Sequence, residues 1–206
     1  MYPFADVIAA QVWQSARIET VKDRLALCFF GFATALAALA AWEQPSLLAW
    51  LAVLHNAVLT CLYARRLPAR RYDRRGFWLG ALAAVLPLAA PYPQEIHPLW
   101  MTFGLCGYGL TLWALLSLGR RFGVAPADRG LVMHGPYRWL RHPVYTGELI
   151  LRLALAVQSP QPLLALLLWL ALAVIQVLRA RREETILSGY GEYAGVVRYR
   201  LLPGVW

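Results

Sequence analysis

The chain has 206 residues, of which 60% are hydrophobic, and a formal net charge of +9 at pH 7. This hydrophobic share exceeds the roughly 45–50% that is usual in soluble globular domains, and it is concentrated in runs rich in Leu and Ala. The composition therefore excludes an ordinary soluble domain and predicts an all-α fold, a polytopic integral membrane helical bundle. The three cysteines stand apart inside apolar runs, so neither a disulfide framework nor a metal site is expected.

The first 24 residues precede the first apolar run and mix charged with apolar side chains. A signal peptide is not expected here, because the stretch lacks a short apolar core followed by a cleavage site. Its apolar residues fall near one helical face, beginning at Phe4 and Val7 and reaching Trp13. Residues 1–24 are therefore predicted to form an amphipathic helix that lies at the membrane surface.

Six apolar segments follow along the chain. They cover residues 25–42, 47–64, 76–93, 98–118, 143–158 and 161–178. A helix needs about 20 residues to cross the hydrocarbon core of a bilayer, and about 17 at the least. About six membrane segments are therefore expected, and the fifth of them is short. The first three would form an N-terminal membrane part over residues 25–97.

The basic residues alternate along the chain. They gather before the first segment and after the second, fourth and sixth, whereas the loops at 43–46, 94–97 and 159–160 contain neither Lys nor Arg. The positive-inside rule then places both termini and the loop after the fourth segment in the cytoplasm. The same residues would attract anionic lipids of the inner leaflet. Because the membrane explains the charge, nucleic-acid binding is not expected.

The stretch 135–147, GPYRWLRHPVYTG, is unusual for a membrane boundary. Pro136 and Pro143 each restrict the preceding residue to extended conformations, so the loop has a defined shape. Pro143 suits the first position of a helix, and the free N–H groups of that first turn would form an anion site beside Arg141 and His142. An interfacial belt of arginines and aromatic residues is the alternative interpretation.

The sixth apolar run is expected to continue beyond the membrane as a cytoplasmic C-terminal helical extension, which Gly189 and Gly191 end. Arg179 and Glu183 are spaced four residues apart in this extension. Glu183 and Glu184 point about 100° apart on a helix. One of them could therefore meet a cation while the other pairs with an arginine. A solvated, charged helix end is the alternative.

Small and ionisable residues also interrupt the fourth and fifth segments. Gly107 and Gly109 allow close backbone approach, either by another helix or by a ligand. Glu148 and Arg152 are four residues apart, so they share one helical face. Ionisable residues at membrane depth usually face a cavity or one another, and an internal salt bridge is one of these two possibilities.

Together these motifs resemble the isoprenylcysteine carboxyl methyltransferase family and its relatives, which include phospholipid N-methyltransferases. The pattern G-x-Y-x-x-x-R-H-P-x-Y-x-G is matched at residues 135–147, and R-x-x-x-E-E-x-x-L is matched at residues 179–187. Tyr193 and Pro203 also match, whereas Val196 stands where the family often has a second tyrosine. Gly107 and Gly109 look like the upstream glycine motif of the phospholipid branch. The resemblance covers about residues 100–204.

The resemblance implies a methyltransferase core over residues 98–206 that uses S-adenosylmethionine and acts on a lipophilic acceptor arriving from the bilayer. The residues that it places around the cofactor are Gly107, Gly109, Tyr137, Arg141, His142, Pro143, Tyr145, Glu183 and Glu184. The residues expected to act on the acceptor are Arg179, Glu183, Glu148 and Arg152. The arginines would orient an anionic acceptor, and a glutamate would serve as a base for an amine or a phenol.

Two other functions stay open at this point. One is a membrane reductase of the sterol-reductase type, whose C-terminal helices are similar but hold NADPH, and the other is a non-enzymatic scaffold. The single lysine beside nineteen arginines, together with the abundance of Ala and Leu, is typical of a GC-rich bacterial genome. The protein is therefore expected in a bacterial inner membrane. A bacterial lipid, a quinone-like phenol or a small isoprenoid acid would fit there as the acceptor.

Overall fold

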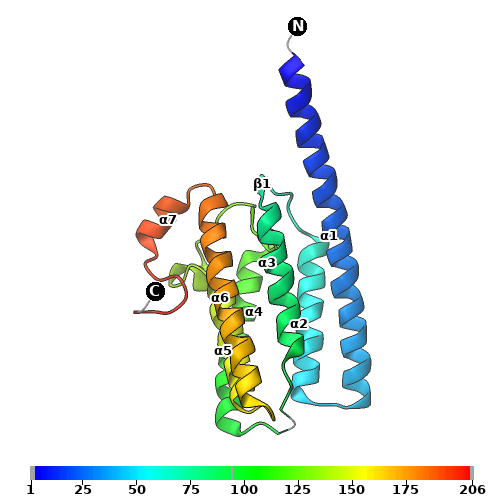
Figure 1. Ribbon diagram of the computed structural model, residues 1–206, viewed down its shortest axis with the longest axis vertical. Helices are drawn as coiled ribbons and strands as arrows, with labels where there is room; N and C mark the ends of the chain where they lie inside the picture. The colour runs from blue at the N-terminus through cyan, green and yellow to red at the C-terminus, as the bar shows by residue number, and fades with distance from the viewer. Residues whose placement is uncertain (1–2, 94, 205–206) are drawn as a thin grey trace. The chain divides into compact units, whose positions relative to one another are not determined.

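A computed structural model shows a chain that is mostly helical (Figure 1). The structure describes residues 3–93 and 95–204, and it describes their side chains except for those of residues 3–20 and residue 74. The amphipathic face predicted for residues 1–24 therefore lies almost wholly outside the described side chains. That prediction stays untested.

The helices and strands follow one another with short connections. In chain order they are α1 (Pro3–Glu43), α2 (Leu47–Ala64), β1 (Arg71–Tyr72), α3 (Arg74–Val85), η1 (Leu86–Ala89), α4 (Pro98–Leu118), η2 (Gly119–Arg121), β2 (Ala127–Asp128), η3 (Gly135–Arg138), α5 (Pro143–Val157), α6 (Pro162–Ile186) and α7 (Tyr190–Val196). The three η elements are short 3₁₀ helices.

The chain divides into two compact units, Met1–Arg66 and Leu67–Trp206. The first unit is a helical hairpin of α1 and α2, in which the ring of Phe30 packs 5.4 Å from that of Tyr63 and Asp23 pairs with Arg66. The second unit contains all of the motif residues. The domain boundaries expected from the sequence at residues 24 and 97 stay a prediction.

Four of the described helices are long and apolar enough to cross a membrane. They are Val21–Glu43, Leu47–Ala64, Pro98–Arg121 and Pro162–Ile186. Helix α3 has 12 residues and α5 has 15, both below the minimum of about 17 for a simple crossing. Pro87 contributes to the shortness of α3, since the helix gives way to the 3₁₀ turn η1 where this residue removes an N–H donor. Four of the six expected segments are thus supported by length and composition.

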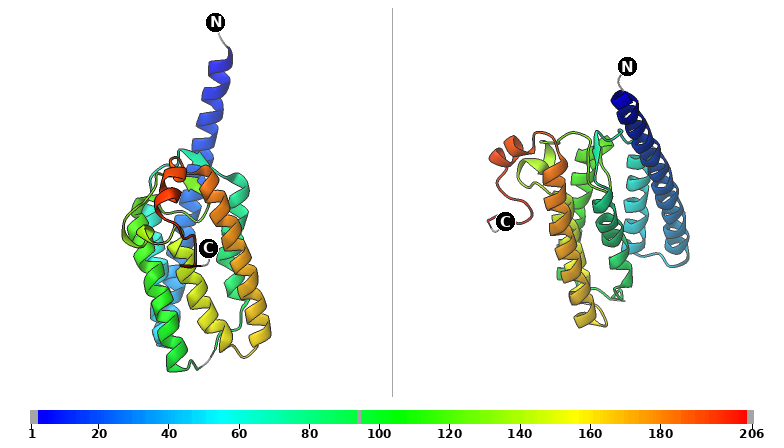
Figure 2. Two further views of the ribbon diagram at one scale, coloured as in Figure 1. Left: turned by 90° about the vertical axis from the view of Figure 1, so that its left-hand side faces the viewer. Right: turned by 45° about the horizontal axis from the view of Figure 1, so that its top comes forward.

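Helix α5 lies between α4 and α6 (Figure 2). Two glycines make the contact with α4 close, because a Cβ on Gly107 would lie 2.7 Å from the carbonyl oxygen of Gly147 and 2.6 Å from the side chain of Ile150. A Cβ on Gly147 would in turn collide with the carbonyl of Gly107 and the hydroxyl of Thr111. Gly109, by contrast, is exposed and has open space around it. The two glycines of the predicted motif therefore do not line one site.

Helix α6 contacts α3 in two places, an apolar cluster and an ion pair. Ala83 of α3 packs with Leu172 and Ile175 of α6 in an apolar cluster. Closer to the loops, Asp73 caps α3 by accepting a hydrogen bond from the N–H of Arg75, and it also pairs with Arg182 of α6 at 3.0 Å. The antiparallel pair β1–β2 lies beside this contact and brings the loop between α4 and α5 to the start of α3.

The glycine contact predicts opposite effects for two similar substitutions. Gly107→Ala adds a methyl group where the α5 backbone lies, so we expect it to reduce stability by about 1–3 kcal/mol. Gly109→Ala adds the same methyl group into open space on a helix, where alanine is favoured over glycine by about 0.5–1 kcal/mol. Thermal unfolding of the two variants in detergent tests this, and equal midpoints would contradict the described helix contact.

Candidate functional site

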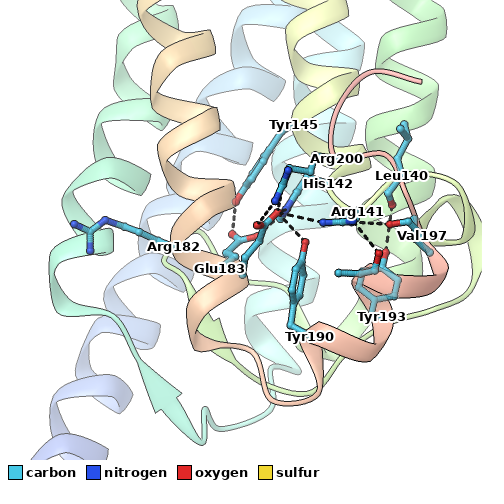
Figure 3. Close-up of polar contacts among 12 residues, drawn as sticks. Leu140, Arg141, His142, Tyr145, Arg182, Glu183, Tyr190, Tyr193, Val197 and Arg200 are labelled. Carbon is cyan, nitrogen blue, oxygen red and sulfur yellow. Dashed lines mark hydrogen bonds and ion pairs between the residues drawn. The ribbon is translucent and has the colours of Figure 1, made fainter. Parts of the chain in front are cut away.

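A group of ionisable and aromatic side chains lies at the end of the second unit that carries β1 and α7 (Figures 1 and 3). Its side chains come from η3 and the start of α5, and from the end of α6 and the C-terminal tail. By the C-terminal tail we mean α7 and the residues that follow it. We call it the His142 cluster. Its members are Tyr137, His142, Tyr145, Arg179, Glu183, Glu184, Tyr190 and Arg200.

The loop before α5 is shaped by glycine and proline. Gly135 has a φ of +61°, in the left-handed region, and a Cβ there would collide with Ser117 and lie 3.3 Å from the indole nitrogen of Trp113. Pro136 then starts the 3₁₀ turn η3 and is fully buried. Tyr137 follows with its ring packed against Val132. Burial raises the pKa of the Tyr137 phenol, and the carboxylate of Glu183 raises it further.

The C-terminal tail runs beside the entry to α5. Leu140 forms a parallel bridge with Tyr199, and the N–H groups of Arg141 and His142 donate to the carbonyls of Tyr199 and Arg200 at 2.9 and 3.0 Å. The hydroxyl of Tyr193 donates to the carbonyl of Tyr137 at 2.7 Å. These bonds hold the tail in place over the start of α5.

Arg141 fastens this arrangement. Its guanidinium donates to three tail carbonyls, those of Val197 at 2.6 Å, Ala194 at 2.9 Å and Arg198 at 3.2 Å. The sequence predicts Arg141 as a cofactor contact. In the structure, its N–H groups donate to the tail, while its guanidinium lies 4.0 Å from Glu184 and 5.9 Å from the centre of the Tyr190 ring.

His142 lies between two adjacent carboxylates and is 5% exposed. Its Nδ1 is 3.3 Å from Glu183 Oε2, and its Nε2 is 3.5 Å from Glu184 Oε1. The imidazole stacks on the ring of Tyr145, with centroids 5.6 Å apart and planes at 4°. The phenol of Tyr145 in turn donates a hydrogen bond to Glu183 (Figure 3). Glu183 is therefore held from two sides.

The protonation of His142 follows from this position. Burial alone would lower the pKa of the imidazole, but the carboxylates of Glu183 and Glu184 outweigh burial and hold the pKa above its ordinary value. A protonated ring has an N–H donor on each nitrogen, one facing each carboxylate. The Nε2 atom is nevertheless buried and has no hydrogen-bond partner at its present distance from Glu184. It remains a donor that a ligand oxygen could use.

Glu184 is held by the tail. Arg200 approaches it with two nitrogens, at 2.7 and 3.1 Å, and the hydroxyl of Tyr190 donates to it at 2.9 Å. The expectation that one glutamate of the pair binds an arginine is confirmed. The arginine that pairs with Glu184 is Arg200, however, and not Arg179, which lies four residues before Glu183. Spacing along the sequence did not indicate Arg200 as the partner of Glu184. The two residues are 16 positions apart, and only the folded path of the tail brings them together.

Arg179 is buried and makes different contacts. It donates to Gln176 Oε1 and to the carbonyl of Val124, both at 2.8 Å, and its guanidinium lies 4.6 Å from the centre of the Tyr145 ring. Gln176, which is fully buried, donates to Glu148 Oε2 at 2.6 Å. A polar chain thus leads from the cluster into the helix bundle. The sequence analysis missed Gln176, although a polar amide inside the sixth apolar run was a usable signal.

Glu148 and Arg152 share a helical face as expected but bind different partners. Glu148 accepts from Gln176, whereas Arg152 donates to the phenol of Tyr92 at 2.7 Å. The structure therefore joins Glu148 to the His142 cluster and leaves Arg152 outside it. The internal salt bridge considered from the sequence is replaced by these two separate contacts.

The anion site expected at the start of α5 is largely used by the protein itself. The N–H of His142 donates to Arg200, and the N–H of Tyr145 donates back to the His142 carbonyl at 3.1 Å. Pro143, the first helical residue, has no N–H to offer and is fully buried. The tail thus takes the N–H of His142 just before the helix, and the His142 carbonyl takes the N–H groups of Tyr145 and Thr146.

Asp128 is a structural residue that the sequence analysis missed. It is fully buried and accepts hydrogen bonds from the hydroxyl of Ser188 at 2.6 Å and the N–H of Gly130 at 3.0 Å. Burial raises the pKa of its carboxyl, but these hydrogen bonds outweigh burial and the pKa falls below its ordinary value. Asp128 thereby fixes the loop between α4 and α5 to the turn after α6.

The raised pKa of His142 predicts a pH dependence of stability. The protonated ring stabilises the fold below pH 6.5, and this contribution is lost as the pH rises through the higher pKa of the folded state. Unfolding midpoints between pH 6 and pH 9 should therefore fall more steeply for the natural chain than for His142→Gln. Parallel curves for the two proteins would show that the ring is neutral throughout.

Comparison with known proteins agrees with the motifs. Residues 99–192 match the family described as phospholipid methyltransferase. A search of curated proteins found no match. The matched range contains α4, the shaped loop, α5, α6 and both glutamates of the cluster. With four described helices able to span a bilayer, the chain is an integral membrane protein, and its residues 99–192 form a phospholipid methyltransferase domain, which belongs to the isoprenylcysteine carboxyl methyltransferase and phospholipid methyltransferase family.

Proposed function

We propose that the chain transfers a methyl group from S-adenosylmethionine to a lipophilic acceptor, with the His142 cluster holding the cofactor. The observation that carries this proposal is the pairing of two carboxylates with buried cations that keep unused donors. Nε2 of His142 and Nε of Arg179 are both buried and have no hydrogen-bond partner. The His142 donor suits the carboxylate of the cofactor, and the Arg179 donor suits a polar group of the acceptor. Glutamates suit the ammonium group or the ribose hydroxyls of the cofactor.

The chain's residues would divide the work of binding. Glu183, with the ring of Tyr145 beside it, is proposed to accept hydrogen bonds from the cofactor's polar groups, and His142 to meet its carboxylate. Glu184 is engaged by Arg200 and Tyr190, so it is proposed to hold the tail against the site. When bound, S-adenosylmethionine supplies an electrophilic methyl group on its sulfonium sulfur.

The acceptor side of the site is proposed to lie along the polar chain of Arg179, Gln176 and Glu148. Arg179 would orient an anionic or polar head group with the Nε–H that has no protein partner. A carboxylate acceptor needs no base, whereas an amine or a phenol would give its proton to Glu148. Holding the two reactants in line is the main contribution, which can reach about 7–11 kcal/mol.

The cluster is proposed to lie on the cytoplasmic side of a bacterial inner membrane, because S-adenosylmethionine is made in the cytoplasm. The basic loop between α4 and α5 and the basic tail both carry cluster residues, as the positive-inside rule requires of that side. Helices α3 and α5 would then complete six membrane segments as short, partly embedded elements. Helix α7 and the tail would form the cytoplasmic extension, close to anionic lipids.

Substitution of the two glutamates should separate cofactor binding from tail attachment. We expect Glu183→Gln to weaken S-adenosylmethionine binding about 10- to 100-fold, because it removes the charge from a charge-assisted hydrogen bond. The matched substitution Glu192→Gln, on an exposed position of α7, should leave binding unchanged. Filter binding of tritiated cofactor measures both. Unchanged affinity in Glu183→Gln would remove Glu183 from the site.

Arg179 should affect the acceptor more than the cofactor. In Arg179→Lys the fork that joins Gln176 and Val124 is lost, so we expect methyl transfer into lipids extracted from the host to fall at least about tenfold. Cofactor affinity should change much less. Arg182→Lys, on the same helix but paired with Asp73, is the control. Equal loss of cofactor binding in Arg179→Lys would contradict an acceptor role.

The same assay decides between the proposed activity and a reductase. Binding of tritiated S-adenosylmethionine without binding of NADPH supports the methyltransferase, and the reverse result supports a reductase of the sterol-reductase type. Failure to bind either would favour a scaffold. Identification of the labelled product in a host lipid extract would then name the acceptor.

A further inference from the structure

The donor that His142 keeps for a ligand is closed off from solvent. Its Nε2 atom is buried without a hydrogen-bond partner, and the whole side chain is 5% exposed. The ring of Tyr145, which stacks on the imidazole, is equally buried. A ligand as large as S-adenosylmethionine reaches this donor only after a covering segment has moved.

The last described residues of the tail, 198–204, lie next to this donor, and we call them the strap. Arg200 of the strap meets Oε1 of Glu184 at 2.7 Å. Nε2 of His142 approaches the same oxygen to 3.5 Å, so the guanidinium and the imidazole stand close together (Figure 3). The strap therefore lies against the atom that is proposed to meet the cofactor.

Leu201 of the strap lies against the second ring. It is buried and packs against Tyr145, whereas the other side chains of the strap are exposed or half-buried. The carbonyl of Leu201 accepts a hydrogen bond from the hydroxyl of Thr146 at 2.8 Å. The strap thus covers the surroundings of both rings with one charged side chain and one apolar side chain.

Mostly polar contacts hold the strap in place. The N–H groups of Arg141 and His142 donate to its backbone at 2.9 and 3.0 Å, and Arg200, whose side chain is 33% exposed, pairs with Glu184. Water can replace the protein partner in each of these bonds. A chain end with few buried apolar contacts has a low free energy of local opening. The strap can therefore detach while the rest of the second unit stays folded.

The other segments around the cluster are held by apolar packing. Helix α7 keeps its place through the buried side chains of Tyr190, Tyr193 and Val197, which pack together. Helix α5 lies closely on α4, because Gly107 and Gly147 bring the two backbones into contact. Movement of either helix would break up a packed core. The strap is therefore the covering segment that moves most easily.

We propose that the strap opens to admit S-adenosylmethionine to the His142 cluster and closes over it, with the pair of Arg200 and Glu184 as its fastening. The proposal rests on the proposed function, because it takes the cluster as the cofactor site. Opening removes Arg200 from Glu184 and Leu201 from the ring of Tyr145, so the ligand can meet Nε2 of His142. The observed affinity for the cofactor then depends on the fraction of molecules in which the strap is open.

A reversible lock tests the proposal. Leu140 and Tyr199 are partners in the parallel bridge, and neighbouring strands lie about 4.8 Å apart, which suits a disulfide. The test protein carries Leu140→Cys and Tyr199→Cys, and its three natural cysteines are replaced by serine. Tritiated S-adenosylmethionine should associate at least about tenfold more slowly with the oxidised protein than with the reduced protein. Equal rates would overturn the strap, whereas absence of cofactor binding by the natural chain would overturn the proposed function.

Hydrogen exchange in the absence of cofactor is an independent measurement. The N–H groups of Arg141 and His142 are bonded to the strap, so they exchange when it opens. Arg200→Gln removes the charge from the fastening and should speed this exchange about tenfold. Arg198→Gln, at an exposed position of the strap whose backbone carbonyl is kept, is the control and should leave the exchange unchanged. Circular dichroism verifies that both variants are folded. Equal exchange in the natural chain and in folded Arg200→Gln would overturn the inference, whether or not the chain binds the cofactor.

Discussion

The arrangement of the second unit depends on a histidine ring buried between two consecutive glutamates. Two carboxylates at the end of an apolar helix are costly to bury, because each loses its water and they repel each other. His142 compensates Glu183, and Arg200 compensates Glu184, at distances of 3.3 and 2.7 Å. These pairs bring together the start of α5, the end of α6 and the tail. Removal of either cation would leave a largely buried carboxylate with fewer compensating partners.

The remaining contacts of the cluster keep this arrangement in register. Arg141 holds three carbonyls of the tail, and the tail's backbone caps the start of α5. Asp128, in the loop between α4 and α5, binds the turn after α6 by accepting a hydrogen bond from Ser188. Many of the charged groups near the site thus form hydrogen bonds and ion pairs within the protein. Nε2 of His142 and Nε of Arg179 are the buried donors of the cluster that have no hydrogen-bond partner in the described part of the chain.

Several features followed from the sequence because they depend on local chemistry. The apolar runs predicted membrane helices, since a backbone in lipid must satisfy its own hydrogen bonds. Pro143 starts α5 as expected, because its missing N–H costs nothing there. The pattern at residues 135–147 and 179–187 indicated the methyltransferase family, which the match over residues 99–192 confirms.

What only the tertiary structure decided is which partner each of these groups takes. Spacing on one helix favoured pairs such as Arg179 with Glu183 and Glu148 with Arg152. In the fold, Glu148 binds Gln176, Glu184 binds Arg200 and Arg152 binds Tyr92, each from another segment. Gly107 is likewise used by the α4–α5 contact, which depends on a glycine forty residues away. The sequence by itself determined the four long apolar helices, the membrane class and the family of the matched domain. Side-chain pairing in a bundle is set by which helices meet, and that information is not local.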